Sequence, residues 1–323
     1  MKFSEYIPPT SDFGFKNLFG KGEKSKDNLI FLLNEVLKDY PDFDPVVSVE
    51  YLNSEHQGDN PDRKSTRFDV YCRTESNKVF IVEMQNQPDP HLNQRLIFYM
   101  CQAVTEQDSR VYLEKAWNYN FPPVIVIMFC DFTDPEIDPV EVNHFGFMNL
   151  KTHKQFGNHV GLSIVQMPLF PTTKSECKTE LDKIVFSMMN MDTILTKKEN
   201  SFSTQEGDFY DRIEKMSRTA ALTREELHAY HQWLKVTNDD RLWREKAREE
   251  GLAEGRAEGL AEGRAEGLAK GRTEGRTEGR AEGIAEGKWQ MAKKMIDDGM
   301  DLDKIALYSQ IPIDQLRQRL KDS

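Results

Sequence analysis

Two carboxylates and an amide in the first third of the chain have the types and spacing of a metal-dependent hydrolytic site. Glu83 and Gln85 are two residues apart in a strand-type run, so their side chains project to the same face. A turn-rich tetrapeptide precedes this run, and a hairpin partner on its other side would place Asp69 beside them. Oxygen ligands at such a point suit Mg²⁺ or another divalent cation such as Mn²⁺, to which the Met84 carbonyl could add a backbone ligand.

Such a site indicates hydrolysis of phosphodiester bonds. A divalent cation lowers the pKa of a water that it binds, orients that water and offsets the charge growing on the phosphoryl oxygens. The amide of Gln85 carries no charge and cannot act as a general base, so the metal would have to activate the nucleophile. The alternative interpretation is that Asp69 and Glu83 are ordinary strand-end residues beside a turn, and spacing alone does not decide between the two.

The elements that would position these residues follow from apolar periodicity and from helix and turn signals. The runs Arg67–Arg73 and Lys78–Gln85 predict an antiparallel hairpin. The other predicted elements are a helix capped by Ser11 or Asp12, a helix over Asn28–Leu37, a strand around Val46–Leu52, a helix after Pro90, a buried strand over Val124–Phe132, a strand near Leu162–Leu169 and a helix over Leu181–Met189. This alternation predicts an α/β fold with a mixed central sheet flanked by helices.

Five ordered segments resemble the recombination-promoting nucleases, a family of PD-(D/E)xK nuclease family transposases. These segments are Thr10–Gly20, Arg67–Val70, Val82–Gln87, Arg95–Gln102 and Val124–Phe132. The resemblance implies a restriction-endonuclease-like core and a metal-dependent DNA endonuclease of low sequence specificity. It also implies a role in DNA recombination or in acting on mobile or foreign DNA.

The resemblance further implies a role for each motif residue. Asp69 takes the place of the motif's aspartate, Glu83 that of its second acid, and Gln85 the place where most of the superfamily has lysine. Glu35, on the first apolar helix, is placed like the helix-borne acid that many nucleases of this superfamily add to the metal site. A solvent-facing helix charge is the alternative for Glu35.

Weaker candidates for phosphate contacts lie on two other predicted helices. Arg95, Tyr99 and Gln102 recur at i, i+4 and i+7, so they line one stripe of the helix that comes after the active strand. Alternatively, Arg95 caps the sheet edge and Tyr99 packs in the core. Lys16 is a weaker candidate still.

The composition restricts partners and compartment. A formal net charge of −11 counts against non-specific coating of nucleic acid, so any contact with DNA must be local. The four cysteines are far apart without a CxxC pair, which argues against a zinc site or a disulfide framework. The start lacks an apolar signal segment, and the longest apolar run is too short to span a bilayer. We therefore expect a soluble, cytoplasmic bacterial protein with no membrane partner.

The sequence predicts four parts: a nuclease domain over 1–200, a helical extension over 201–250, a charged repeat over 251–287 with glycine at every fourth position, and a small helical segment over 288–323. Glycine at this density costs on the order of 8–10 kcal/mol relative to alanine, so a lone helix should be marginal. The repeat is then either a frayed helical spacer or an inter-chain helix that packs through glycine and makes a homo-oligomer. The last segment, from Asp301, has a pattern similar to a helix-turn-helix.

A second hypothesis, from a different class, is a catalytically inactive DNA-binding or self-assembling module. In that case the hairpin is scaffold and the C-terminal repeat mediates oligomers. Cleavage of a plasmid by the wild type, Asp69→Ala and Glu83→Ala, each with Mg²⁺ and with EDTA, discriminates between the two hypotheses.

Overall fold

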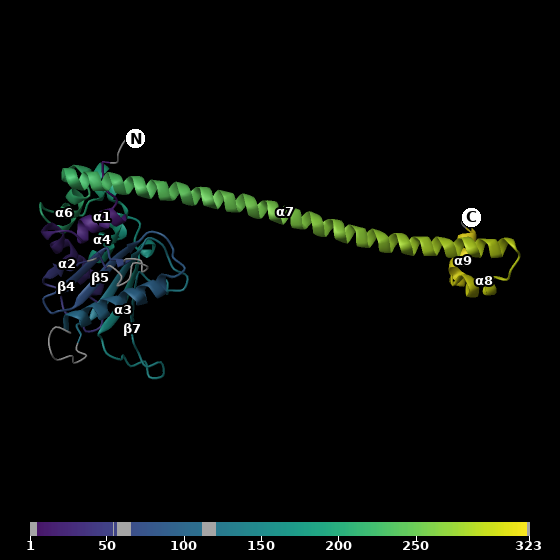
Figure 1. Ribbon diagram of the computed structural model, residues 1–323, viewed down its shortest axis with the longest axis horizontal. Coiled ribbons are helices and arrows are strands. Elements are labelled where there is room, and N and C mark those ends of the chain that lie inside the picture. The colour runs from purple at the N-terminus through teal and green to yellow at the C-terminus, as the bar shows by residue number, and fades with distance from the viewer. Residues whose placement is uncertain (1–4, 54, 57–65, 112–120, 322–323) are drawn as a thin grey trace. The chain divides into compact units, whose positions relative to one another are not determined.

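We describe the protein from a computed structural model, which gives residues 5–53, 55–56, 66–111 and 121–321 (Figure 1). The chain divides into two compact units, Met1–Lys235 and Val236–Ser323. The strands of the first unit are β1 (Val49–Tyr51), β2 (Glu55–His56), β3 (Thr66–Arg67), β4 (Val70–Thr74), β5 (Val79–Gln85), β6 (Val124–Cys130), β7 (Val142–Gly146) and β8 (Val160–Gln166).

The helices of the first unit are α1 (Asp12–Phe19), α2 (Glu23–Leu37), α3 (Leu92–Val111), α4 (Glu180–Met189), α5 (Met191–Thr196) and α6 (Phe209–Met216). Short 3₁₀ turns are η1 (Met167–Leu169), η2 (Lys174–Glu176), η3 (Lys198–Asn200) and η4 (Thr219–Ala221). Helix α7 (Arg224–Asp297) begins in this unit and ends in the second, which also contains α8 (Leu302–Ser309) and α9 (Ile313–Lys321). In the described part of the chain, no helix combines the length and apolarity that crossing a bilayer would require.

A mixed six-stranded sheet, in the order β1-β4-β5-β6-β8-β7, forms the centre of the first unit. Strands β1, β4 and β5 pair antiparallel, β5, β6 and β8 pair parallel, and β7 lies antiparallel to β8 at the edge. The predicted α/β class, a mixed sheet flanked by helices with a helical C-terminal extension, is confirmed. All seven residues of β6 are buried, which explains its unbroken apolar run.

Helices cover both faces of the sheet (Figure 1). Phe80, Val82 and Met84 of β5 pack in the core that α1, α2, α4 and α6 form on one face. Val79 and Ile81 pack in the core beneath α3 on the other face. Because side chains alternate along a strand, residues 83 and 85 belong to the α3 face.

The hairpin of β4 and β5 has the predicted antiparallel pairing, with Val70 opposite Val82. Its turn is closed by a hydrogen bond from the Asn77 amide to the Thr74 carbonyl at 3.0 Å, and Asn77 has a φ of 65°. Asparagine tolerates this left-handed conformation better than most residues, which accounts for its place in the turn. The run that the sequence predicts as one strand before this turn is divided between β3 and β4.

The start of α1 is capped by Ser11, one of the two predicted candidates. Its hydroxyl accepts a hydrogen bond from the Gly14 amide at 3.1 Å, which satisfies one of the free N–H groups of the first turn. The chain before the helix packs closely on it, since a Cβ at Gly14 would lie 1.9 Å from the Pro8 carbonyl oxygen. Glycine is therefore required where the incoming chain crosses α1.

The first unit differs from the predicted organisation in two places. Strand β7 was not predicted, because Asn143, His144 and Gly146 interrupt the apolar alternation that marks a strand. The unit also continues to Lys235, past the predicted boundary at residue 200, because Phe209 and Ile213 of α6 bury in the same core as α2 and α4.

Helix α7 continues without a break through the glycine repeat. The repeat therefore does not have the frayed conformation that one of the two interpretations of the sequence expected. The helix is not isolated. In the first unit its early turns pack on α1, where the rings of Tyr230 and Phe13 lie 5.0 Å apart, and in the second unit its last turns enter a core. Extending a helix from an existing end avoids the cost of nucleation, which offsets part of the glycine penalty.

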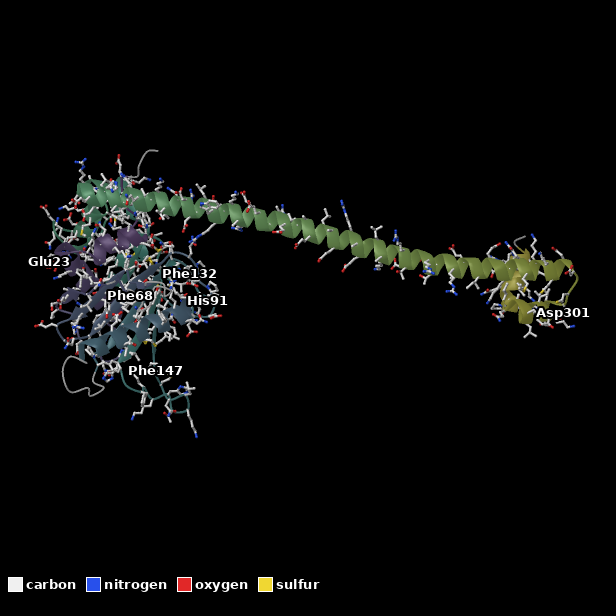
Figure 2. All side chains as sticks on the ribbon, in the orientation of Figure 1. Glu23, Phe68, His91, Phe132, Phe147 and Asp301 are labelled. Carbon is white, nitrogen blue, oxygen red and sulfur yellow. The ribbon has the colours of Figure 1, made fainter. Side chains whose placement is uncertain are left out.

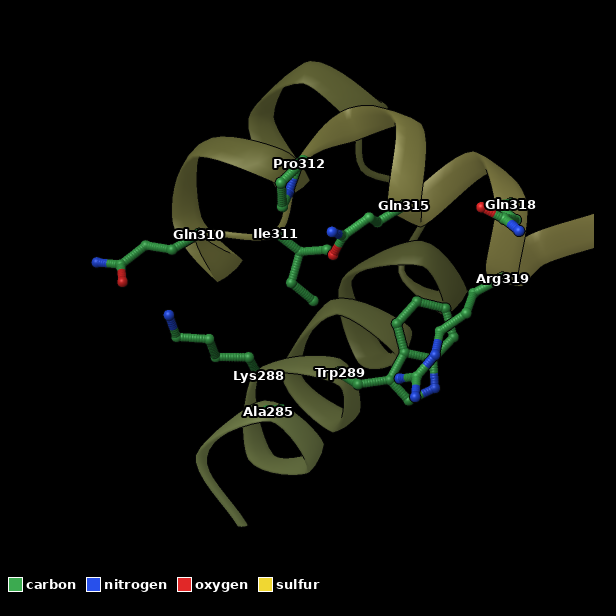
Figure 3. Close-up of a pocket in the computed structure, with 9 residues that line it drawn as sticks. All are labelled: Ala285, Lys288, Trp289, Gln310, Ile311, Pro312, Gln315, Gln318 and Arg319. Carbon is green, nitrogen blue, oxygen red and sulfur yellow. The ribbon is translucent and has the colours of Figure 1, made fainter. Parts of the chain in front are cut away.

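The second unit has a small core in which Ala292 of α7, Ile305 of α8 and Leu316 of α9 are fully buried. A cavity of about 430 Å³ lies between the end of α7, the α8–α9 turn and α9 (Figure 3). The guanidinium carbon of Arg319 lies 4.9 Å from the Trp289 ring centroid at its wall. Helices α8 and α9 begin directly after Asp301 and Pro312.

Candidate active site

Two reciprocal hydrogen bonds hold Asp69 and Glu83 together. The Asp69 amide donates to Oε1 of Glu83 at 3.0 Å, and the Met84 amide donates to Oδ2 of Asp69 at 3.0 Å. The register of the β4–β5 hairpin causes this arrangement, because it places the residue before Val70 opposite the residue after Val82. One oxygen of each carboxylate is thereby oriented by the backbone, and Oδ1 of Asp69 and Oε2 of Glu83 are left to face other partners.

Helix α1 brings a cation and a further acid to this pair. The ammonium group of Lys16 lies 3.0 Å from Oδ1 of Asp69. Asp12 lies one helical turn before Lys16, and its pKa is raised by burial and then by the charge of Asp69. Asp12 is absent from the predicted site. Its signal in the sequence is the i, i+4 pairing with Lys16 inside the Thr10–Gly20 segment.

The end of α1 lies directly against the backbone that carries Asp69. A Cβ at Gly20 would lie 2.9 Å from the Asp69 carbonyl oxygen and 3.2 Å from Cγ2 of Val70. These distances are shorter than ordinary contacts, so glycine allows the helix to approach. This close approach sets how far Lys16 can reach toward Asp69.

Glu83 is in an environment that disfavours its negative charge. Glu83 is only 7% exposed. This burial raises the pKa of Glu83 to about 8, and the charge of Asp69 makes a smaller contribution in the same direction. The charges of Lys16 and Arg95 act in the opposite direction. A buried acid beside a second carboxylate is stabilised by a proton or by a cation bound between them.

At the motif's lysine position, the Gln85 amide is held by protein groups on both of its ends. Oε1 accepts a hydrogen bond from Nη2 of Arg95 at 2.5 Å, and Nε2 donates to the Gln87 carbonyl at 2.8 Å. Arg95 also forms an ion pair with Asp89 at 2.8 Å. The positive charge that lysine would carry at position 85 is therefore supplied next to it by Arg95, from the first turns of α3.

The predicted stripe on α3 divides into two parts. Tyr99 packs edge-on against Phe68, with ring centroids 5.2 Å apart, and the guanidinium carbon of Arg95 lies 5.9 Å from the Tyr99 ring. The pKa of Tyr99 is raised by burial and then by the charge of Glu83, which places Tyr99 near the acid pair. Gln102 instead donates to Glu106 at 3.4 Å, further along the helix.

Glu35 is not brought to the acid pair. Its carboxylate lies 3.8 Å from the ammonium group of Lys38, the residue directly after α2, and its charge contributes to the raised pKa of Tyr210. The charged groups that shift the pKa of Glu83 are Asp69, Lys16 and Arg95. In this structure the helix-borne acid close to Asp69 is thus Asp12 of α1 and not Glu35 of α2.

The donor set fits a divalent cation that keeps much of its hydration. No cluster of three or more His, Cys, Asp and Glu side chains with metal-binding geometry occurs among the described residues. Mg²⁺ requires less, since one or two carboxylates with waters and substrate oxygens complete its octahedron. The Met84 amide points toward Asp69, and the carbonyl of the same residue points to the same side of the strand. Asp69, Glu83 and the Met84 carbonyl therefore offer hard oxygen donors on one side.

The fold and this pair define a class of protein. A mixed sheet carries an acid before one strand and a Glu-x-Gln triplet at the end of its hairpin partner, which matches the order of the PD-(D/E)XK motif with glutamine in place of its lysine. The model of the family described as PD-(D/E)XK nuclease family transposase matches residues 9–247, and the chain belongs to this family. No curated protein and no solved structure matches the chain. Membership in the family supports a nuclease-type activity.

Proposed function

We propose that the protein is a Mg²⁺-dependent endonuclease that hydrolyses phosphodiester bonds in DNA. The observation that carries the proposal is the pair of reciprocal hydrogen bonds between Asp69 and the Glu83–Met84 segment, which holds two carboxylates beside each other. Family membership supports the reaction class. The nuclease function is assigned to the first unit, the repeat over 251–287 to a helical spacer, and 288–323 to a small separate segment.

Asp69, Glu83 and the Met84 carbonyl would hold the cation. When bound, a divalent cation lowers the pKa of a coordinated water and neutralises charge on the phosphoryl oxygens. Glu83 then stays ionised, because the opposing charge replaces the proton that burial otherwise favours. Gln85 orients Arg95 through Oε1 and, as an amide, takes no proton from the nucleophile.

Lys16 and Arg95 would meet the scissile phosphate. The Lys16 ammonium lies 3.0 Å from Asp69 Oδ1. When DNA binds, it could leave this ion pair and contact a phosphate oxygen instead. Arg95 comes from α3, whereas Lys16 comes from α1, and the planar guanidinium group of Arg95 is suited to contact a phosphate. Contacts of this kind are made to the DNA backbone and carry no base information, which supports low sequence specificity. Roles in recombination or in acting on mobile or foreign DNA would be in keeping with the family's description.

The experiment is cleavage of supercoiled plasmid by the wild type, Asp69→Asn and Glu83→Gln, with Mg²⁺, with Mn²⁺ and with EDTA. We expect nicked or linear product only from the wild type with metal. Asp44→Asn serves as the matched control, because Asp44 has an 81% exposed side chain and pairs with Lys78 outside the site. Equal cleavage by the wild type and both site variants would contradict the proposal.

A second candidate, self-assembly through α7, is favoured by one observation. Leu252, Leu260 and Leu268 are more than half exposed on the helix, and nothing lies within 4 Å of a Cβ added at the repeat glycines. These leucines are eight residues apart, so their line turns by about 80° per step, and a second helix from another copy would have to wind around α7 to contact all three. Sedimentation of the full chain at increasing concentration tests this, with the three leucines changed to glutamine as the comparison. A monomer at every concentration would exclude the oligomer.

A further inference from the structure

A hydrogen-bonded hairpin extends β7 beyond the sheet. We call residues 147–159 the β7–β8 hairpin, and Figure 2 marks Phe147 on it. The Phe156 amide donates to the Phe147 carbonyl and the Asn149 amide to the Lys154 carbonyl, both at 2.8 Å. At the tip, Oδ1 of Asn149 accepts from the amides of Lys151 and Thr152 at 2.9 and 3.0 Å. The segment is thus an ordered two-stranded ribbon.

The β7–β8 hairpin is exposed along its whole length, and its apolar side chains are large. All residues from 145 to 159 are exposed. Leu150 at the tip is 88% exposed, and Phe156 and Phe147 on the two arms are 82% and 60% exposed. Several large apolar side chains exposed on one short hairpin are typical of a surface that binds a partner.

The charge of this segment is opposite to that of the chain. No aspartate or glutamate occurs from Val142 to Ser175, in a protein whose net charge is −11. The same stretch contains Lys151 and Lys154 at the tip, with His153 between them. A local positive charge in an acidic chain favours a polyanionic partner.

We propose that the β7–β8 hairpin is a contact element for duplex DNA. A two-stranded ribbon fits the major groove, and lysines beside it can contact phosphates while an apolar tip such as Leu150 contacts bases. The proposal rests on the proposed nuclease function, since DNA is then the partner that the first unit must hold. A second copy of this chain is the competing occupant.

The position of the hairpin defines its role. Gly146 pairs with Gly161 at the start of β8, whereas Glu83 and Gln85 lie at the opposite end of the parallel strands β5, β6 and β8. Along β8, Gly161 lies three residues from Ile164, which is in register with Glu83, and the tip at Leu150 lies four residues beyond Gly146. At about 3.3 Å per residue, these seven residues separate the tip from the acid pair by about 23 Å along the strands, or about seven base pairs of duplex. The hairpin therefore holds DNA at a distance from the acid pair, and it contributes to binding rather than to chemistry.

The first test measures DNA binding by the full chain carrying Glu83→Gln, which prevents cleavage. Fluorescence anisotropy with a 30-base-pair duplex is recorded at several salt concentrations. This protein is compared with one that also carries Lys151→Gln and Lys154→Gln. We expect affinity to fall about tenfold or more and the slope of log K against log salt to fall by about two. Lys197→Gln with Lys198→Gln is the matched control, since these residues are also exposed, and should leave both quantities unchanged.

A DNA stem of about six base pairs is too short to span both positions, so the lysine substitutions should not change binding of such a stem at the acid pair. An equal loss on both DNA lengths, or no loss on either, would overturn the proposal. Plasmid cleavage by the wild type is measured separately. If the hairpin proposal is wrong, the wild type still cleaves the plasmid in the presence of metal. If the nuclease proposal is wrong, the wild type does not cleave it.

The second test identifies the occupant directly. The photoreactive residue p-benzoylphenylalanine replaces Leu150 in the full chain, and the protein is irradiated with the 30-base-pair duplex. A covalent chain–DNA product supports the proposal. A chain–chain product without a chain–DNA product assigns the hairpin to contact with a second copy and overturns it, as does the absence of both products.

Discussion

The ammonium group of Lys16 and Oδ1 of Asp69 lie 3.0 Å apart, although one belongs to α1 and the other precedes β4. The site therefore has a lysine next to its first acid, but the lysine comes from a different element than the motif position at Gln85. In the free protein this ion pair balances part of the charge of the two carboxylates. When substrate and cation are present, the same ammonium is close enough to contact a phosphate.

Replacement of Lys16 by methionine should have opposite effects on metal binding and on catalysis. Loss of the competing positive charge should tighten binding of Mg²⁺ at Asp69, while loss of a phosphate contact should slow cleavage on the order of 10²-fold. Calorimetric titration of the metal and single-turnover cleavage measure the two effects. Lys26→Met is the matched control on α2, since Lys26 pairs with Glu23. Weaker metal binding together with slower cleavage would count against this role.

Asp12 and Glu35 should respond differently to removal of their charge. Asp12 lies near Asp69 and its pKa is raised in part by that carboxylate, so Asp12→Asn should weaken Mg²⁺ binding about tenfold or more. Glu35→Gln should leave metal binding and cleavage unchanged, because Glu35 pairs with Lys38 away from the acid pair. The reverse order of the two variants in a metal titration would restore Glu35 as the helix-borne acid.

The stability of the metal-free protein should fall as the pH rises from about 5 to 8. Burial raises the pKa of Glu83 from its ordinary value of 4.5 to about 8, so the folded protein holds a proton that the unfolded chain releases in this interval. This contribution is complete below pH 4.5 and is lost as the pH passes through 8, at most a few kcal/mol and on the order of 10 °C in Tm. Thermal unfolding in EDTA measures it.

Two comparisons test that Glu83 causes this pH dependence. Glu83→Gln cannot titrate, so its Tm should vary less between pH 5 and 8 than that of the wild type. Mg²⁺ should raise the wild-type Tm more at pH 8 than at pH 5, because at low pH the proton competes with the metal. A wild-type Tm that is constant with pH in EDTA would contradict the environment described for Glu83.

Gly20→Ala should damage the site through the backbone. The added Cβ would meet the Asp69 carbonyl oxygen at 2.9 Å, so α1 or Asp69 must shift. We expect a loss of about 1–3 kcal/mol in the free energy of unfolding and a larger proportional loss of cleavage than of stability. Gly146→Ala is the control, because the nearest atom to its added Cβ lies 4.0 Å away. Urea unfolding and plasmid cleavage of both variants make the comparison, and unchanged cleavage by Gly20→Ala would exclude the proposed coupling.

The sequence predicts local elements and their pairing better than it predicts packing between them. The hairpin of β4 and β5 is predictable from two strand-type runs around a short turn, and the cap at Ser11 from residue type, because both depend on neighbours along the chain. The proximity of Asp69 and Glu83 is a consequence of hairpin register. For these parts, local chemistry is enough.

The contributions of α1 could not be predicted in the same way. Whether Asp12 or Glu35 reaches the acid pair depends on which helix end approaches the sheet, and that is decided by the contact between Gly20 and the Asp69 backbone. Likewise, β7 lacks apolar alternation because it is an edge strand whose outward residues are exposed. Long-range contacts of this kind leave little trace in a single sequence.

The glycine-spaced part of α7 has a consequence at the level of its coding DNA. Each unit of four residues corresponds to twelve nucleotides, so replication slippage can add or remove a unit without changing the reading frame. One unit changes the length of the helix by about 6 Å and rotates the residues beyond the insertion by about 40°. Since the repeat side chains are exposed and nothing lies within 4 Å of the glycines' added Cβ positions, such length variants should fold equally well. Mutation can therefore vary the length of α7 while it leaves Asp69 and Glu83 unchanged.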